Sequence, residues 1–138
     1  MLFHSGDDNY TIRYSKPVGL VELIWHGAVS SDQFQVALSH IIEVLKEDQV
    51  KFFLIDAKRL NPFRAKDQTW LKKHFFPKLN ETQVIKFARI TEPDLFTQAV
   101  VGDLVQYVHH NKSFKFNIHS FYERDEALEW LLNEVLVD

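Results

Sequence analysis

Apolar residues near the start of the chain alternate with polar ones, and this alternation predicts strands. Tyr10, Ile12 and Tyr14 alternate with polar neighbours, as in a strand that is buried on one face. The stretch 18–26 alternates in the same way. Pro17 lies in the short connection between the two stretches and favours a turn, because its φ is fixed. The two strands are therefore predicted to pair as an antiparallel hairpin.

Apolar residues at helical spacing follow the hairpin. Ser30 is followed three residues later by a glutamine, which is the pattern of a capping box. The helix predicted after this box has an apolar stripe made of Phe34, Leu38, Ile41 and Leu45. Further helices are predicted to begin at Asp67, which can act as an N-cap, after Thr91, and at Glu123. Pro77 is expected to end or kink the second helix.

Three more strands are predicted between these helices, at Lys51–Asp56, Val84–Ile90 and Phe114–Phe121. The first of them is an almost unbroken apolar run, typical of a central strand that is covered on both faces. The order is β-β-α-β-α-β-α-β-α, which predicts an α/β domain with one five-stranded mixed sheet and an antiparallel N-terminal hairpin. Residues 1–8 are interpreted as a frayed polar lead, and residues 9–138 as a single domain.

Composition and charge limit the functions open to this chain. It has 138 residues, 46% hydrophobic and 25% charged, which is typical of one globular domain. The net charge of −3 argues against broad attraction to nucleic acid or to an anionic membrane. Cysteine is absent, which excludes disulfides and thiolate metal sites and fits a cytoplasmic location. No apolar run approaches the ~20 residues of a membrane span, and no signal peptide is expected.

The sequence contains none of the common motifs of catalytic or cofactor-binding sites. It has no glycine-rich phosphate loop, no G-x-S-x-G and no H-E-x-x-H, so no cofactor is expected. Seven histidines are present, and His109 and His110 are neighbours on a predicted helix, where their side chains diverge by about 100°. They are interpreted as charges at a helix C-terminus, and no metal site is expected.

The carboxyl ends of the strands are the usual ligand-binding edge of an open α/β sheet. The residues predicted to form a ligand-binding or partner-binding surface there are His26, Asp56, Lys58, Arg59, Arg64 and Asp67. The basic side chains either meet an anion or form a solvated loop that the two aspartates balance. The aspartates are also the best-placed pair for acid–base catalysis. A structural role is favoured for both, Asp56 as an acceptor for loop amides and Asp67 as a helix cap.

Several segments together resemble a known family. WHGAVSSDQFQVAL is followed by a predicted helix, then by KFFLIDAKRL, by D-x-x-W-L and finally by EALEWL. This order resembles the SpoIIAA-like branch of the STAS domains, the sulfate-transporter and anti-sigma-factor-antagonist modules, also described as STAS/Sec14-like. The resemblance covers roughly residues 9–135. It implies a right-handed β-α superhelix with helices largely on one side of the sheet, and a non-enzymatic role in binding partner proteins or small ligands.

The resemblance also implies a phosphorylation switch, which this sequence does not match. In signalling members, a strand similar to Phe52–Asp56 leads to a D-S-[ST]-G-like segment, in which a partner kinase phosphorylates Ser or Thr. The corresponding segment here is LNPFRAKDQTW, which has no Ser-Gly pair. Its single hydroxyl is that of Thr69, which is expected inside a helix. The switch is therefore not expected in this chain.

Three functional hypotheses follow from these observations. The leading one is a cytoplasmic regulatory or protein-interaction module of the SpoIIAA-like type, without catalytic activity. A competing hypothesis is a carrier or sensor of a small apolar ligand such as a lipid, suggested by the 12 phenylalanines and by the Sec14 link. The least favoured is an enzyme, which requires Asp56 and Asp67 to converge on a cleft.

Self-association is predicted from the expected arrangement of helices. If most helices lie on one face of the sheet, Phe87, Arg89 and the edge stretch Tyr10–Tyr14 need cover on the other face. A second copy of the chain would supply that cover, so a homodimer is predicted.

Overall fold

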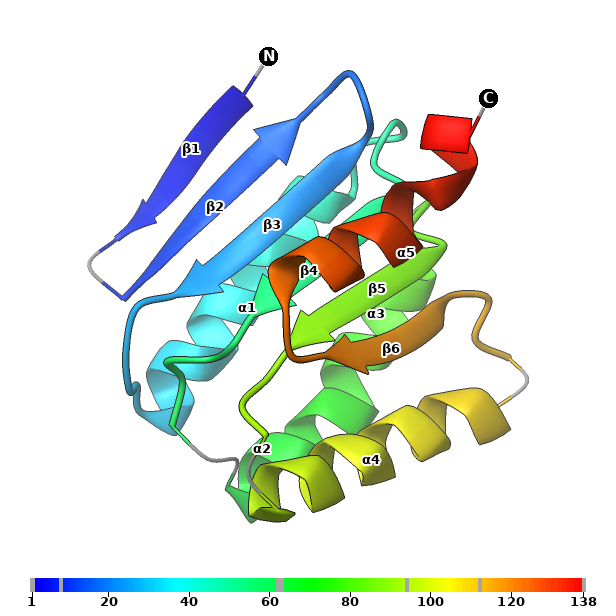
Figure 1. Cartoon of the computed structure of the whole chain (residues 1–138). Coiled ribbons are helices and arrows are strands. Elements are labelled where there is room, and N and C mark those ends of the chain that lie inside the picture. The colour runs from blue at the N-terminus through cyan, green and yellow to red at the C-terminus, as the bar shows by residue number, and fades with distance from the viewer. Residues whose placement is uncertain (1, 8, 62–63, 94, 112, 138) are drawn as a thin grey trace.

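A single six-stranded sheet runs through the computed structural model, which describes residues 2–7, 9–61, 64–93, 95–111 and 113–137 (Figure 1). The strands are β1 (Leu2–Asp7), β2 (Tyr10–Ser15), β3 (Leu20–Trp25), β4 (Phe52–Asp56), β5 (Lys86–Ile90) and β6 (Asn117–Phe121). The helices are α1 (Ser31–Leu45), α2 (Ala65–Trp70), the π-helix η1 (Leu71–Phe75), α3 (Phe76–Asn80), α4 (Leu95–His110) and α5 (Arg124–Val137).

The strands lie in the sheet in chain order, from β1 at one edge to β6 at the other. β1, β2 and β3 are antiparallel, whereas β3 to β6 are parallel. The predicted mixed α/β sheet with an N-terminal antiparallel hairpin is therefore confirmed. Its strand count was wrong, because β1 adds a sixth strand in which Leu2 pairs with Ser15 and Asp7 with Tyr10. Residues 2–7 contain Gly and Asp, which strands disfavour, and the strand follows from pairing with the otherwise unpaired edge of β2.

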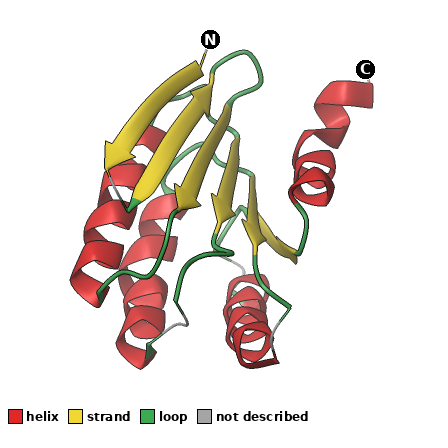
Figure 2. Cartoon of the chain, turned by 60° about the vertical axis from the view of Figure 1, so that its left-hand side comes forward, coloured by secondary structure: helices red, strands yellow, loops and turns green. Residues whose placement is uncertain are grey.

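Helices cover both faces of the sheet, but unequally. Figure 2 shows α5 on one side of the sheet and the other helices on the opposite side. We call the apolar layer under α1, α2–η1–α3 and α4 the main core; its largest fully buried members include Trp25, Phe53, Phe75, Ile12, Leu23, Leu38, Ile41, Leu45 and Leu79. We call the layer under α5 the α5 core; its buried members are Leu20, Phe52, Leu54, Ala88, Ile90, Ala127 and Leu131.

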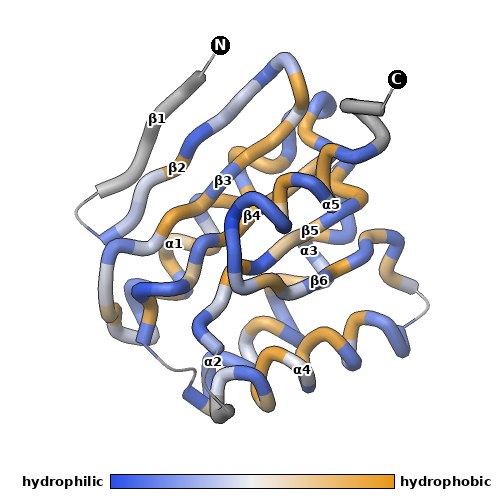
Figure 3. The backbone as a smooth tube through the Cα atoms, viewed as in Figure 1, coloured by the Kyte–Doolittle hydropathy of each residue, from blue (hydrophilic) through white to orange (hydrophobic). Residues whose placement is uncertain are grey.

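β4 is buried between these two layers, as its apolar run predicted. Phe53 and Ile55 belong to the main core, while Phe52 and Leu54 belong to the α5 core. This follows from the alternation of side chains along a strand. Figure 3 shows hydrophobic colour along β4 and hydrophilic colour in the loop after it, at the sheet edge that was predicted to carry the functional surface.

The residues whose exposure motivated a homodimer are covered within the chain. Tyr10 and Tyr14 are buried in the main core, and so is Phe87. Arg89 is only 8% exposed. The expectation that these residues need a second copy to cover them was wrong, because three helical segments lie on their side of the sheet. The homodimer itself stays a prediction, now without that argument.

The helix after β4 begins at a different residue from the one predicted, and it does not end at Pro77. It begins at Ala65, so Asp67 lies in its first turn and is not the N-cap. It also continues through Pro77, which follows the π-helix η1. There the backbone N–H of Phe76 donates to the carbonyl of Leu71, five residues back. The wider π turn lies directly before the proline ring, which a regular α-helix would bring against a carbonyl four residues earlier.

The starts of two other elements differ from those predicted from the sequence. α4 begins at Leu95, so the predicted cap at Thr91 was wrong. The backbone N–H of Thr91 instead donates to the carbonyl of Phe121, which extends the pairing of β5 with β6. β6 begins at Asn117 and not at Phe114. The capping box of α1 is confirmed, because Ser30 accepts from the backbone of Gln33 and the Gln33 side chain accepts from the backbone of Ser30.

Candidate functional site

The six residues of the predicted surface all lie near the carboxyl ends of β3 and β4, but they form separate groups. Arg64 and Asp67 contact the loop that precedes α1. Asp56 and Lys58 belong to the side of the sheet that α5 covers. His26 bonds to β2, and Arg59 is exposed. Each group has its own partners.

A hydrogen-bonded network ties the loop after β4 to the loop before α1. The buried carboxylate of Asp67 accepts from the hydroxyl of Ser31, with Oδ2 and Oγ 3.2 Å apart, and its Oδ2 lies 3.7 Å from Nη1 of Arg64. Arg64 also donates to the backbone carbonyl of Val29, and Asn61 accepts from the Val29 backbone N–H at 2.9 Å. We call these five residues the loop clasp. It fixes the two loops against each other and uses Asp67 as a structural acceptor.

A second polar group lies under the start of α5. The carboxylate of Asp56 accepts from the backbone N–H of Lys58 at 3.2 Å, as predicted for a loop anchor. Lys58 Nζ lies 3.9 Å from a carboxylate oxygen of Glu123. Next to them the guanidinium of Arg124 donates to the carboxylate of Glu22, which is 5% exposed. The hydrogen bond to Glu22, with the charges of Glu22 and Asp56, raises the pKa of Arg124 against the opposing effect of its burial.

The ion pair of Glu22 and Arg124 was missed by sequence reasoning. The available signal was weak. Glu22 lies on the same face of β3 as the apolar residues Leu20 and Ile24. A carboxylate in such a row suggests a buried partner, but nothing local identifies it, because Arg124 is 102 positions away.

His26 and Arg59 complete the predicted surface. Nε2 of the half-buried His26 lies 2.6 Å from the hydroxyl of Thr11, and its backbone N–H donates to the carbonyl of Asn9. Arg59 is exposed, as is Lys66 in the first turn of α2. Within the described part of the chain, neither cation forms an ion pair or a side-chain hydrogen bond. They are the two positive charges of this edge that point outward without an internal partner.

The two aspartates do not face a common cleft in the described structure. Asp56 contacts the start of the next loop and Asp67 contacts α1, and the two share no partner. Four well-formed pockets among the described residues are lined by other side chains and by none of the six predicted residues. The described residues also contain no group of three metal-ligating side chains close enough to share an ion.

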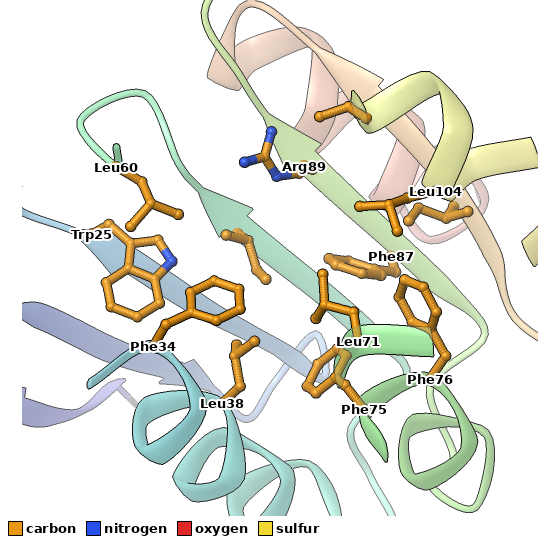
Figure 4. Close-up of a pocket in the computed structure, with 13 residues that line it drawn as sticks. Trp25, Phe34, Leu38, Leu60, Leu71, Phe75, Phe76, Phe87, Arg89 and Leu104 are labelled. Carbon is orange, nitrogen blue, oxygen red and sulfur yellow. The ribbon is translucent and has the colours of Figure 1, made fainter. Parts of the chain in front are cut away.

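A small cavity lies inside the main core, directly below this edge (Figure 4). Its lining is apolar except for one charged side chain, Arg89 of β5, and consists of Trp25, Phe34, Leu38, Ile55, Leu60, Leu71, Phe75, Phe76, Phe87, Arg89, Val101, Leu104 and Ile118. The cavity volume is about 30 Å³, room for roughly two water molecules. It is therefore far smaller than a lipid chain.

Arg89 is the most unusual residue of the cavity. Burial lowers the pKa of its guanidinium to about 10, so the side chain still carries its charge at neutral pH. Its place could be inferred from the pattern of β5, since Arg89 lies two residues after Phe87 and must share the face of that apolar side chain. That face was expected to be uncovered, so the burial of Arg89 within the chain was missed.

Two solved structures are similar to this chain over nearly its whole length. One is an uncharacterised protein of the DUF3478 family with a SpoIIAA-like fold, from Shewanella loihica PV-4; it is 16% identical and has a TM-score of 0.51. The other is an anti-sigma factor antagonist from Mycobacterium paratuberculosis, 12% identical, with a TM-score of 0.53. Each comparison covers 95% of this chain and 92% of the other. This chain has a SpoIIAA-like fold.

The resemblance seen in the sequence is thus confirmed at the level of the fold. No protein-family model matches the chain, and no curated protein matches it significantly. Within the SpoIIAA-like domain, no described helix has the length and apolar character that a bilayer crossing requires. The two structures share the arrangement of sheet and helices with this chain, and function has to be argued from its own residues.

Proposed function

We propose that this SpoIIAA-like domain is a non-catalytic regulatory or protein-interaction module that binds a partner protein at the carboxyl-end edge of β3 and β4. The observation that carries the proposal is the loop clasp. It engages Arg64 and Asp67 internally and leaves Arg59 and Lys66 outward on a fixed frame. The solved anti-sigma factor antagonist with the same fold supports a regulatory role of this kind.

A fixed loop is well suited to binding a protein. A segment that is already ordered loses little conformational entropy when it binds, so more of the contact energy appears as affinity. The backbone N–H of Val29 donates to the side-chain oxygen of Asn61, and the side chain of Arg64 donates to the carbonyl of Val29, so the two loops are held together. Loops that are held together in this way and line none of the four pockets described here fit a partner surface better than a small substrate.

The charge of this edge favours an acidic partner. Arg59 and Lys66 are exposed, whereas Asp67 is buried and Asp56 is half-buried against α5. The exposed charges of the loop after β4 and of the first turn of α2 are therefore positive, although the whole chain carries −3. Charges on the rim of an interface chiefly set the association rate and the choice of partner.

The test is quantitative capture of partners from extracts of the source organism. The variant Arg59→Glu/Lys66→Glu reverses the two outward charges without touching the loop clasp. The control Lys16→Glu/Lys73→Glu makes the same change of charge at exposed lysines elsewhere in the chain. We expect one or more acidic proteins to bind the wild type and the control at least roughly tenfold better than the variant. Equal capture by the variant would reject this edge as the binding surface, and turnover of a substrate that requires Asp56 would reject the non-catalytic role.

The cavity supports a second candidate, the binding of a small apolar ligand. Its apolar lining and its one buried cation, Arg89, favour a compact apolar molecule with an anionic group, and its volume of about 30 Å³ means that any such molecule enters only when the lining residues move apart. Native mass spectrometry of freshly purified protein tests this candidate. A copurified small acid that is lost in Arg89→Met would support it. No bound mass, and no thermal shift with a panel of small aliphatic and aromatic acids, would eliminate it.

A further inference from the structure

The β6 edge of the sheet carries a groove that neither candidate function uses. β6 pairs with β5 on one side, and no described strand pairs with its other side (Figure 1). The groove has a volume of about 430 Å³, and it is lined by Lys86, Val108, His109, Asn111, Phe114, Phe116, Asn117, His119 and Trp130. These residues come from the end of α4, the start of β6, the start of β5 and the middle of α5.

Backbone groups of β6 are directed outward along this edge. In a parallel pair, the N–H and C=O of one residue point to the same side, and successive residues alternate. Asn117 and Phe121 bond inward, to Ile85 and to Thr91. The backbone groups of Ile118 and Ser120 therefore point outward. The Ile118 carbonyl already meets a donor group from outside the sheet, since Nε2 of His109 lies 3.1 Å from it.

Aromatic side chains flank the outward backbone. The ring of Trp130 lies 4.6 Å from that of His119, between centroids, and 5.8 Å from that of Phe121. On the other flank, Phe114 stacks on Phe116 at 5.5 Å. An extended segment added to β6 would thus place its alternate side chains against apolar rings on both sides.

The charge of the groove is of one sign. Its titratable lining residues are Lys86, His109 and His119, which carry positive charge or acquire it on protonation. A groove between α1 and the helix after β4 differs, because Glu43 and Glu81 line it together with lysines. A segment that enters the β6 groove is therefore favoured if it carries carboxylates.

We propose that the outer edge of β6 binds an extended acidic segment of a partner protein as an additional strand. The segment pairs with the outward backbone N–H of Ile118 and with the backbone of Ser120, since the Ile118 carbonyl already meets His109, and its carboxylates meet Lys86. This surface is separate from Arg59 and Lys66. The interaction module proposed above therefore has a second binding surface, which can be tested independently of the first.

The probe is a short peptide that alternates valine with glutamate, titrated into the full chain at low salt with backbone amide NMR as the readout. A peptide that alternates valine with lysine is the charge control. We expect the acidic peptide to shift the amides of Ile118 and Ser120 most and to bind at least roughly tenfold more tightly than the lysine peptide. The largest shifts at any other place, equal binding of both peptides, or no shift at millimolar peptide would overturn the proposal.

Two variants separate backbone pairing from charge. Ser120→Pro removes an outward N–H that the sheet does not use, and edge strands tolerate proline. We expect it to weaken binding roughly fivefold or more, in line with the loss of one hydrogen bond and the steric block. His119→Glu adds a negative charge to the groove, and the matched control His110→Glu makes the same change outside it. If acidic-peptide affinity is the same in both histidine variants, or unchanged in a folded Ser120→Pro, the proposal is wrong.

Discussion

The two faces of the sheet are held by different means. The main core places three helical segments and a dense set of aromatic rings over one face. The α5 core is a smaller apolar layer under one helix, and the ion pair of Glu22 and Arg124 fastens the first turn of that helix. The first face is stabilised by apolar side chains that pack over a large buried area, which many apolar sequences can supply. The second depends on one specific polar contact at the start of α5.

This difference bears on how the candidate surfaces are supported. The loop clasp and the cavity both lie on the main-core side, so the edge with Arg59 and Lys66 has rigid backing. The β6 groove uses Trp130 of α5, so its shape depends on the less extensively packed face. Regions with few buried apolar contacts open at lower free energy than the densely packed part of a domain.

Phe53→Ala is expected to have the largest effect of the changes that compare the two faces. Phe53 is fully buried at the centre of the main core and stacks on Phe87 with ring centroids 4.8 Å apart. Its truncation should lower the free energy of unfolding by about 3–5 kcal/mol, because apolar contacts are lost and a cavity is left in their place. Chemical denaturation measures this. Val36→Ala, at a side chain that is 68% exposed, should change stability by no more than about 0.5 kcal/mol. A small loss in Phe53→Ala would contradict the assigned core.

Leu131→Ala is the matching change in the α5 core, where Leu131 is fully buried. We expect a loss of about 2–3 kcal/mol, at the lower end of the range for such truncations, because a single helix can shift to close the gap. Hydrogen exchange should show faster exchange in α5 with little change in α1. Equal acceleration in both helices would mean that the two faces open together.

Arg124→Met should cost less than either truncation. It leaves the buried carboxylate of Glu22 without its partner, but the Arg124 side chain is 41% exposed, so solvent already weakens the pair. Because of this solvent screening, we expect the free energy of unfolding to fall by only about 1–2 kcal/mol. Glu22→Leu/Arg124→Met removes the stranded charge and should recover most of the loss. If the double variant is as unstable as the single one, the ion pair does not act as described.

The smallest expected effect is a pH dependence from His119. Burial, and then the nearby His109, lower the pKa of His119 below its ordinary value of 6.5. The unfolded chain therefore binds this proton more readily than the folded one. The stability that depends on a neutral His119 is fully present above pH 6.5 and is lost as the pH falls below it. The stability of the wild type should therefore fall slightly relative to that of His119→Gln as the pH is lowered below 6.5, because glutamine does not titrate. A wild type that gains stability relative to the variant as the pH falls would reverse the sign argued here.

Much of the fold could be predicted because its signals are local. The capping box at Ser30 and the apolar run of β4 are each specified within a few neighbouring residues. β1 could not be predicted in this way, because it contains Gly and Asp, which strands disfavour, and the strand is formed by pairing with β2. The π-helix before Pro77 likewise arises from how the packed helix accommodates a proline ring.

The candidate site was predicted in its location and less well in its roles. Asp56 was correctly expected to accept a loop amide, whereas Asp67 was expected to cap a helix and instead accepts from Ser31. Such contacts join loops that are far apart in sequence, so the choice between a cap and a cross-loop acceptor needs the tertiary structure. The same holds for Glu22 with Arg124, where the local pattern shows a buried carboxylate and not its partner.

The most direct test of the central claim is a hydrogen-exchange footprint of the domain bound to a captured acidic partner. The proposal predicts the strongest protection in residues 27–32 and 57–69, the two loops that the loop clasp joins and the start of α2. It also predicts that Arg59→Glu/Lys66→Glu abolishes this protection at the same protein concentrations. Protection confined to other segments, with these loops exchanging as fast as in the free protein, would contradict the assignment of this edge as the binding surface.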